Sequence, residues 1–99
     1  MKAFKLRFTP EASRLISKLH SDNKKLIKLA LNDLCLNPHT GNDLQEELYG
    51  FKPFKIKRYR ILYTINEDKH FIQVFYVGHR KDVYEQFRLL LNELQKTSS

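Results

Sequence analysis

The sequence is poor in cysteine, glycine and proline. Its 99 residues include one cysteine, three glycines and three prolines. A single cysteine excludes a disulfide within the chain and a zinc site built from several cysteines. So few glycines and prolines, beside 41% hydrophobic residues, exclude a collagen-like repeat and disfavour disorder. The composition predicts a chain that folds around an apolar core, as one domain spanning residues 1–99.

Long apolar runs are also missing. A membrane-spanning helix needs about 20 consecutive apolar residues, and no stretch approaches that length. Residues 1–7 interleave charged with apolar side chains, where a signal peptide would have a continuous apolar run. We therefore expect a cytoplasmic protein with no membrane partner.

Acidic residues are scarce relative to basic ones. Eighteen Lys and Arg against eleven Asp and Glu give a formal net charge of +7. Such an excess favours polyanionic partners, with nucleic acid first, an acidic protein second and a membrane surface last. Charge alone does not choose among them.

The N-terminal half has the pattern of a strand followed by two helices. Apolar and charged residues alternate over residues 4–8, as in a half-buried strand. Residues 9–11 (Thr-Pro-Glu) then supply an N-cap, a first-turn proline and a first-turn acid. A second helix is predicted from about 23 to 36, with its cap within residues 21–23 and with Cys35 in the core. The two helices should form an antiparallel hairpin.

The C-terminal half is predicted to contain three strands and a helix. Turn residues at 37–42 and an acidic stretch with Asp43, Glu46 and Glu47 come first. β-Branched and aromatic residues then indicate strands at about 52–57, 59–65 and 70–77, with a hairpin turn at 66–69. An apolar stripe predicts a helix from 82 to about 96; its members are Val83, Phe87, Leu90, Leu91 and Leu94. The predicted order is βααβββα.

A cluster of five cations without an acid lies on the first of these hairpins, and its members are Lys52, Lys55, Lys57, Arg58 and Arg60. If Lys57 and Arg58 form a tight turn, Lys55 lies opposite Arg60. Like charges opposite each other destabilise a sheet, so the pair indicates a bound anion, which we take to be a phosphate. The alternative is a solvated edge hairpin, where lysines commonly prevent aggregation.

Residues 76–84 place His79, Arg80 and Tyr84 at the junction of the last strand and the last helix. This segment, the strand at 58–63 (Arg-Tyr-Arg-Ile-Leu-Tyr) and the element order resemble the RelE/ParE toxin superfamily, specifically its RelE branch, over nearly the whole chain. The resemblance implies an α+β fold, with a curved antiparallel sheet on which an N-terminal helical hairpin and a C-terminal helix pack. It also implies the toxin of a type II toxin–antitoxin system, which cleaves mRNA in the ribosomal A site without a metal.

The resemblance further implies roles for single residues. Arg60 and Arg80 match the arginines that contact the scissile phosphate, and Tyr84 matches a tyrosine that stacks or shuttles a proton. Lys55 and Lys57 match the family's lysine pair. Because the hairpin turn is shorter here, a different gap leaves Lys57 in the turn, with Lys52 or Arg58 as substitutes.

The chemistry of these residues suits RNA cleavage by the 2′-OH, which needs a base, an acid and cations for the extra phosphate charge. A lysine crowded by cations loses its proton more readily, so Lys55 is predicted to be the base, while Arg60 and Arg80 stabilise the transition state. The acid is Tyr84 or His79, although Tyr84 could be core and a strand-end histidine is more often structural. The remaining predicted RNA-binding residues are Lys52, Arg58, His79 and Lys81.

The expected partners are a cognate antitoxin, the ribosome and mRNA. The antitoxin should neutralise the basic sheet or displace the last helix. The scattered histidines (His20, His39 and His70) have no ligand spacing, so we predict no metal and no cofactor. The main alternative is a ParE-like inhibitor of DNA gyrase without nuclease activity. A third is a non-catalytic module that binds RNA or docks an antitoxin.

Overall fold

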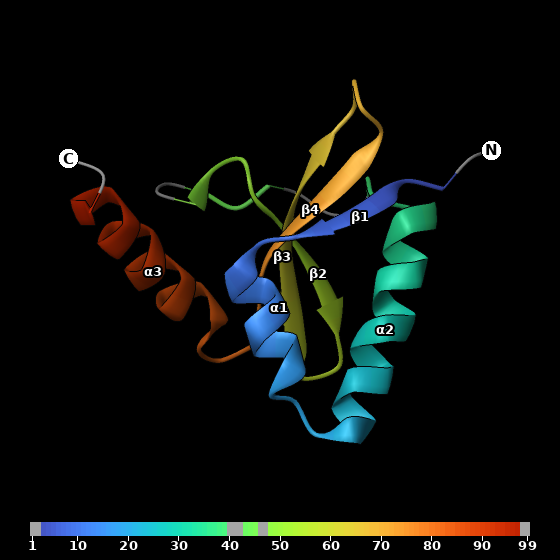
Figure 1. The fold of residues 1–99 in the computed structure, drawn as a ribbon, viewed down its shortest axis with the longest axis horizontal. Coiled ribbons are helices and arrows are strands. Elements are labelled where there is room, and N and C mark those ends of the chain that lie inside the picture. The colour runs from blue at the N-terminus through green and yellow to red at the C-terminus, as the bar shows by residue number, and fades with distance from the viewer. Residues whose placement is uncertain (1–2, 40–42, 46–47, 98–99) are drawn as a thin grey trace.

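In a computed structural model, the chain forms a four-stranded sheet with helices on both faces (Figure 1). The structure describes residues 3–39, 43–45 and 48–97. The elements are β1 (Lys5–Phe8), α1 (Pro10–Ser17), α2 (Ser21–Leu36), β2 (Lys52–Ile56), β3 (Tyr59–Asn66), β4 (Phe71–His79) and α3 (Val83–Thr97). The predicted α+β fold and the βααβββα order are confirmed.

The sheet is mixed, which corrects the expectation of a wholly antiparallel one. Its order is β1-β4-β3-β2, with antiparallel pairs β2–β3 and β3–β4 and a parallel pair β1–β4. Hydrogen bonds from Lys5 N to His70 O (3.1 Å) and from Thr9 N to Val74 O (3.0 Å) extend the parallel ladder. Parallel pairing is possible because β1 and β4 are far apart in the chain, and no hairpin turn imposes an antiparallel direction.

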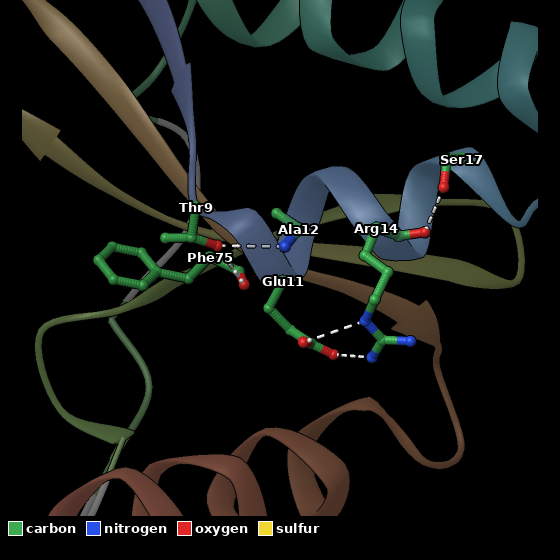
Figure 2. Close-up of polar contacts among 6 residues, drawn as sticks. All are labelled: Thr9, Glu11, Ala12, Arg14, Ser17 and Phe75. Atoms are coloured by element: carbon green, nitrogen blue, oxygen red, sulfur yellow. Dashed lines mark hydrogen bonds and ion pairs between the residues drawn. The ribbon is translucent and has the colours of Figure 1, made fainter.

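A β-bulge interrupts the β3–β4 ladder. Leu62 pairs with Tyr76 but Tyr63 pairs with Val74, so Phe75 is an extra residue in β4. The Phe75 carbonyl accepts a hydrogen bond from the Thr9 hydroxyl (3.2 Å), which also accepts one from Ala12 N (3.1 Å; Figure 2). Thr9 is therefore the predicted cap of α1 and also joins that helix to the bulge.

Helix α2 begins at Ser21, about two residues earlier than predicted. The cap is His20, whose Nδ1 accepts a hydrogen bond from Asp22 N (3.3 Å), because an unprotonated imidazole nitrogen can serve as the capping acceptor. Cys35 is half-buried rather than core, since its neighbour Leu34 takes the fully buried position. Burial raises the pKa of the Cys35 thiol.

Two apolar clusters lie on opposite faces of the sheet. The first joins α1 and α2 to the sheet through Ala12, Ile27, Ala30, Leu31, Leu34, Ile61, Tyr63, Ile72, Val74 and Val77. The second joins α3 to the other face through Leu48, Leu62, Val83 and Phe87. Leu94 is 55% exposed although it belongs to the predicted apolar stripe, so α3 packs through its first half. Figure 1 shows α3 on the side of the sheet away from α2.

The loop after α2 lies only partly within the described residues; residues 40–42 and the predicted acids Glu46 and Glu47 fall outside them. Its described start is tied to the sheet because the fully buried Tyr63 hydroxyl donates to the Pro38 carbonyl at 2.7 Å. The predicted hairpin turn after β3 is present, with Lys69 N donating to the Asn66 side chain (2.9 Å). In the described part of the chain, no helix combines the length and the hydropathy needed to cross a membrane.

We predict that Tyr63→Phe lowers the free energy of unfolding by about 1–2 kcal/mol, because it deprives the buried Pro38 carbonyl of this donor. Urea unfolding measures the change. Tyr49→Phe is the matched control, since Tyr49 is 76% exposed, and it should change stability by less than about 0.5 kcal/mol. Equal stability of the two variants would show that the hydroxyl of Tyr63 contributes nothing.

Candidate active site on the α3 side of the sheet

The turn between β2 and β3 has the predicted form. Lys57 and Arg58 occupy it, Ile56 pairs with Tyr59 and Lys55 pairs with Arg60. Lys57 has a φ of 52°, in the left-handed region. The two cations Lys55 and Arg60 therefore lie directly across from each other, as expected from the sequence.

These two cations are on the α3 side of the sheet. On β3, Ile61 faces the first cluster, so its neighbour Arg60 faces the other way, as Leu62 does. Lys55 is exposed and Arg60 is half-buried. On β4 the same row continues with Gly78, which pairs with Arg60.

Gly78 makes room for the start of α3. A Cβ at this position would lie 3.2 Å from Cγ2 of Val83, which is fully buried. Because Gly78 has no side chain, Val83 packs directly on β4 in the row that holds Lys55 and Arg60. Tyr84 follows Val83 and is half-buried against the second cluster. The cationic pair, Gly78 and the first turn of α3 thus form one surface.

Main-chain carbonyls at the β2–β3 turn accept hydrogen bonds from the side chain of Arg60 and from the backbone of Arg80. The Nη1 group of Arg60 donates to Lys57 O (3.1 Å) and to Tyr59 O (2.8 Å). The backbone N–H of Arg80 donates to Arg58 O (2.6 Å). The turn therefore brings the backbones of Arg58 and Arg80 side by side, next to the row.

The structure separates two predicted RNA-binding residues from this surface. Residues directly opposite in an antiparallel pair share a face, so His79 lies with Tyr59 on the α1–α2 side. Its ring is 6.2 Å from that of Tyr59, and its Nδ1 accepts from Lys81 N (3.3 Å). Lys52 pairs with Tyr63 on the same side, and its Nζ lies 2.5 Å from an Asp43 carboxylate oxygen. Lys81 is exposed beyond the end of β4.

The cations of the candidate site lack acidic partners within the described residues. Contacts there between a basic side chain and a carboxylate involve Arg14, His20, His39, Lys52 and Arg88, and none involves Lys55, Lys57, Arg58, Arg60 or Arg80. Among the same residues no group of three or more His, Cys, Asp or Glu side chains could hold a metal ion. The positive charge on this surface is thus open to an external anion.

Sequence reasoning did not select Tyr76, which pairs with Leu62 on the α3 side and joins the second cluster. Burial raises the pKa of Tyr76, the charge of Glu11 raises it further, and the charge of Arg14 lowers it. Arg14 donates to both carboxylate oxygens of Glu11 in Figure 2. The i, i+3 spacing of Glu11 and Arg14 is visible in the sequence, but their proximity to Tyr76 depends on the packing of α1 along β4.

The βααβββα fold is that of the class of small RelE-like toxins. Residues 6–84 match the model of the family "ParE toxin of type II toxin-antitoxin system, parDE". Toxin RelG of Mycobacterium tuberculosis is 31% identical over 85 residues, which cover 84% of this chain and 98% of RelG.

Two solved structures extend the comparison. The M. tuberculosis toxin–antitoxin complex RelBE2 contains a chain with a TM-score of 0.72 and 30% identity, covering 80% of this chain and 100% of that one. The isolated RelE toxin of E. coli has a TM-score of 0.68 and covers 90% of this chain and 99% of its own, but at 22% identity it supports the fold alone. The chain belongs to the ParE toxin family of type II toxin–antitoxin systems, as a RelE-like member of the RelE/ParE superfamily.

Proposed function

We propose that this toxin is a metal-independent endoribonuclease that acts in the cytoplasm, cleaves mRNA on the ribosome and thereby inhibits translation. The observation that carries the proposal is the pair of Lys55 and Arg60, directly opposite on the sheet and without an acidic partner among the described residues. Like charges so placed repel each other, and a phosphate between them would relieve that repulsion. Similarity to RelE-like toxins in sequence and fold supports the same proposal.

The proposed reaction is attack of the RNA 2′-oxygen on the adjacent phosphorus. Lys55 takes the proton of the 2′-OH, and the bond from phosphorus to the 5′-oxygen breaks as the new bond forms. Arg60 and Arg80 bind the non-bridging oxygens, whose negative charge grows in the transition state. A proton from Tyr84 completes the departing 5′-OH, and a 2′,3′-cyclic phosphate remains on the other fragment.

The geometry favours Tyr84 over His79 as the proton donor. Tyr84 follows Val83, which packs on Gly78 in the row of Lys55 and Arg60, whereas His79 faces the α1–α2 side. Arg58 and Lys81 are exposed near the row and would bind neighbouring phosphates. Lys52 is paired with Asp43 on the other face, so it would contribute less to RNA binding.

We further propose that a cognate antitoxin binds this toxin, as in the RelBE2 complex of M. tuberculosis and the RelBE complex of E. coli. An acidic or amphipathic segment would cover the basic face or displace α3, whose buried anchors are Val83 and Phe87. The alternative function is inhibition of DNA gyrase, which the resemblance to ParE toxins implies.

Arg80→Ala should abolish toxicity in cells without unfolding the protein, because the Arg80 side chain is exposed beyond the end of β4 and alanine keeps the backbone hydrogen bond to Arg58. Losing one transition-state donor costs about 100- to 1,000-fold in kcat. The matched control is Lys28→Ala, which removes an exposed cation of α2 on the far side of the sheet and should leave toxicity unchanged. A folded Arg80→Ala protein with full toxicity contradicts the assignment.

Cleavage should depend on the ribosome, because cations and a tyrosine stabilise phosphate charge well but activate the 2′-OH poorly. The purified protein is offered one mRNA, free and in programmed ribosomes, with and without EDTA. We expect cutting on the ribosome only, unaffected by EDTA. If about four cations bind phosphates, the logarithm of affinity should fall with the logarithm of salt at a slope of about −3. Equal cutting of free RNA refutes the mechanism, and inhibition of gyrase without cutting supports the alternative.

A tagged copy of the protein, purified from its native host, should bring down a small acidic or amphipathic protein in stoichiometric amount. High salt should weaken that complex if charge on the basic face holds it, and should leave it intact if the partner occupies the apolar site of α3. Recovery of the toxin as a free monomer only, under low salt, argues against an antitoxin.

A further inference from the structure

Lys57 is held in a backbone conformation that lysine seldom adopts. Its φ of 52° lies in the left-handed region, where a Cβ crowds the following carbonyl and where glycine or asparagine is better tolerated. The side chain is exposed, so packing does not explain why this residue stands there. A two-residue hairpin turn needs a positive φ at its first position, so the pairing of Ile56 with Tyr59 fixes this conformation.

The conformation of Lys57 directs its carbonyl to Arg60. Arg60 Nη1 donates to Lys57 O (3.1 Å) and to Tyr59 O (2.8 Å), so both hydrogens of this nitrogen are used. The Nε–H and the two Nη2–H groups donate to no acceptor among the described residues. Nε and Nη2 together form the edge that binds two oxygens of a phosphate at once.

We propose that Lys57 is a positioning residue for Arg60. Its main-chain carbonyl, fixed by the left-handed turn, occupies Nη1 and thereby presents the Nε–Nη2 edge of Arg60 to the scissile phosphate. The ammonium group of Lys57 is not the base of the reaction. This inference rests on the proposed function, and it names how one of the two arginines is oriented.

The same turn orients the backbone of the second arginine. Arg80 N donates to Arg58 O at 2.6 Å, so three successive residues, Lys57, Arg58 and Tyr59, supply carbonyls that hold Arg60 or Arg80. Lys55, in contrast, lies in the strand with its side chain in the cationic row. The short turn therefore separates the two lysines by role, one acting through its side chain and the other through its backbone.

The test varies the backbone preference of residue 57 independently of its charge. Lys57→Gly and Lys57→Asn lose the ammonium but accept a positive φ, whereas Lys57→Val loses the ammonium and resists that conformation. Lys57→Ala tolerates a positive φ better than valine but less well than glycine, and it replaces the valine variant if that variant does not fold. Lys55→Ala serves as the reference for loss of the proposed base.

The first readout is kcat on programmed ribosomes. An exposed charge is worth less than about fivefold, so the glycine and asparagine variants should lose no more than that. A misplaced Arg60 should cost on the order of 100-fold in the valine variant, with alanine between. If Lys57→Gly loses as much activity as Lys55→Ala, the ammonium matters and the inference is wrong.

The second readout is independent of cleavage. Nitrogen NMR of the Arg60 Nε group, assigned with Arg60→Lys, is followed during titration with inorganic phosphate. The response should persist in the glycine and asparagine variants and weaken in the valine variant. An equal response in all variants overturns the inference. If the wild-type protein cuts no RNA, the proposed function fails, and this titration alone still decides whether residue 57 orients Arg60.

Discussion

The hydrogen-bonded pairing of β3 with β2 and β4 is the constraint on which the rest of this structure depends. Side chains alternate along β3, so one register places Ile61 and Tyr63 in the first cluster and Arg60 on the α3 side. A slip of one residue would exchange these faces, burying a guanidinium and exposing the core. Because burial enforces the register, the position of Arg60 opposite Lys55 is as well determined as the core itself.

The two faces of the sheet differ in how completely helices cover them. The face covered by α1 and α2 is packed with apolar side chains and contains no buried charge among the described residues. The other face is covered only in part, because α3 is anchored at its first half by Val83 and Phe87. Gly78 allows this helix to begin directly beside the cations. A surface for anions can therefore exist next to an apolar cluster without any cation being buried.

Backbone groups complete the candidate site. Carbonyls at the β2–β3 turn and the start of β3 accept hydrogen bonds from the side chain of Arg60, and the Arg58 carbonyl accepts one from the backbone of Arg80 as the β3–β4 ladder continues. Carbonyl acceptors hold a guanidinium without neutralising it, whereas a carboxylate would compete with phosphate. The surface thus keeps its charge while the side chain of Arg60 is held in place.

The sequence by itself determined the element order, the Thr9 cap of α1 and the opposition of Lys55 and Arg60, because each depends on residues close together in the chain. Only the tertiary structure decided the parallel pairing of β1, the partner of Lys52 and the faces of His79 and Gly78. The faces of the β4 residues did not follow from the sequence because of the bulge at Phe75. The bulge places Val74 and Val77 on one face, although simple alternation would put them on opposite faces. That bulge is stabilised by the hydroxyl of Thr9, which lies 66 residues earlier, and no local pattern in the sequence encodes such a contact.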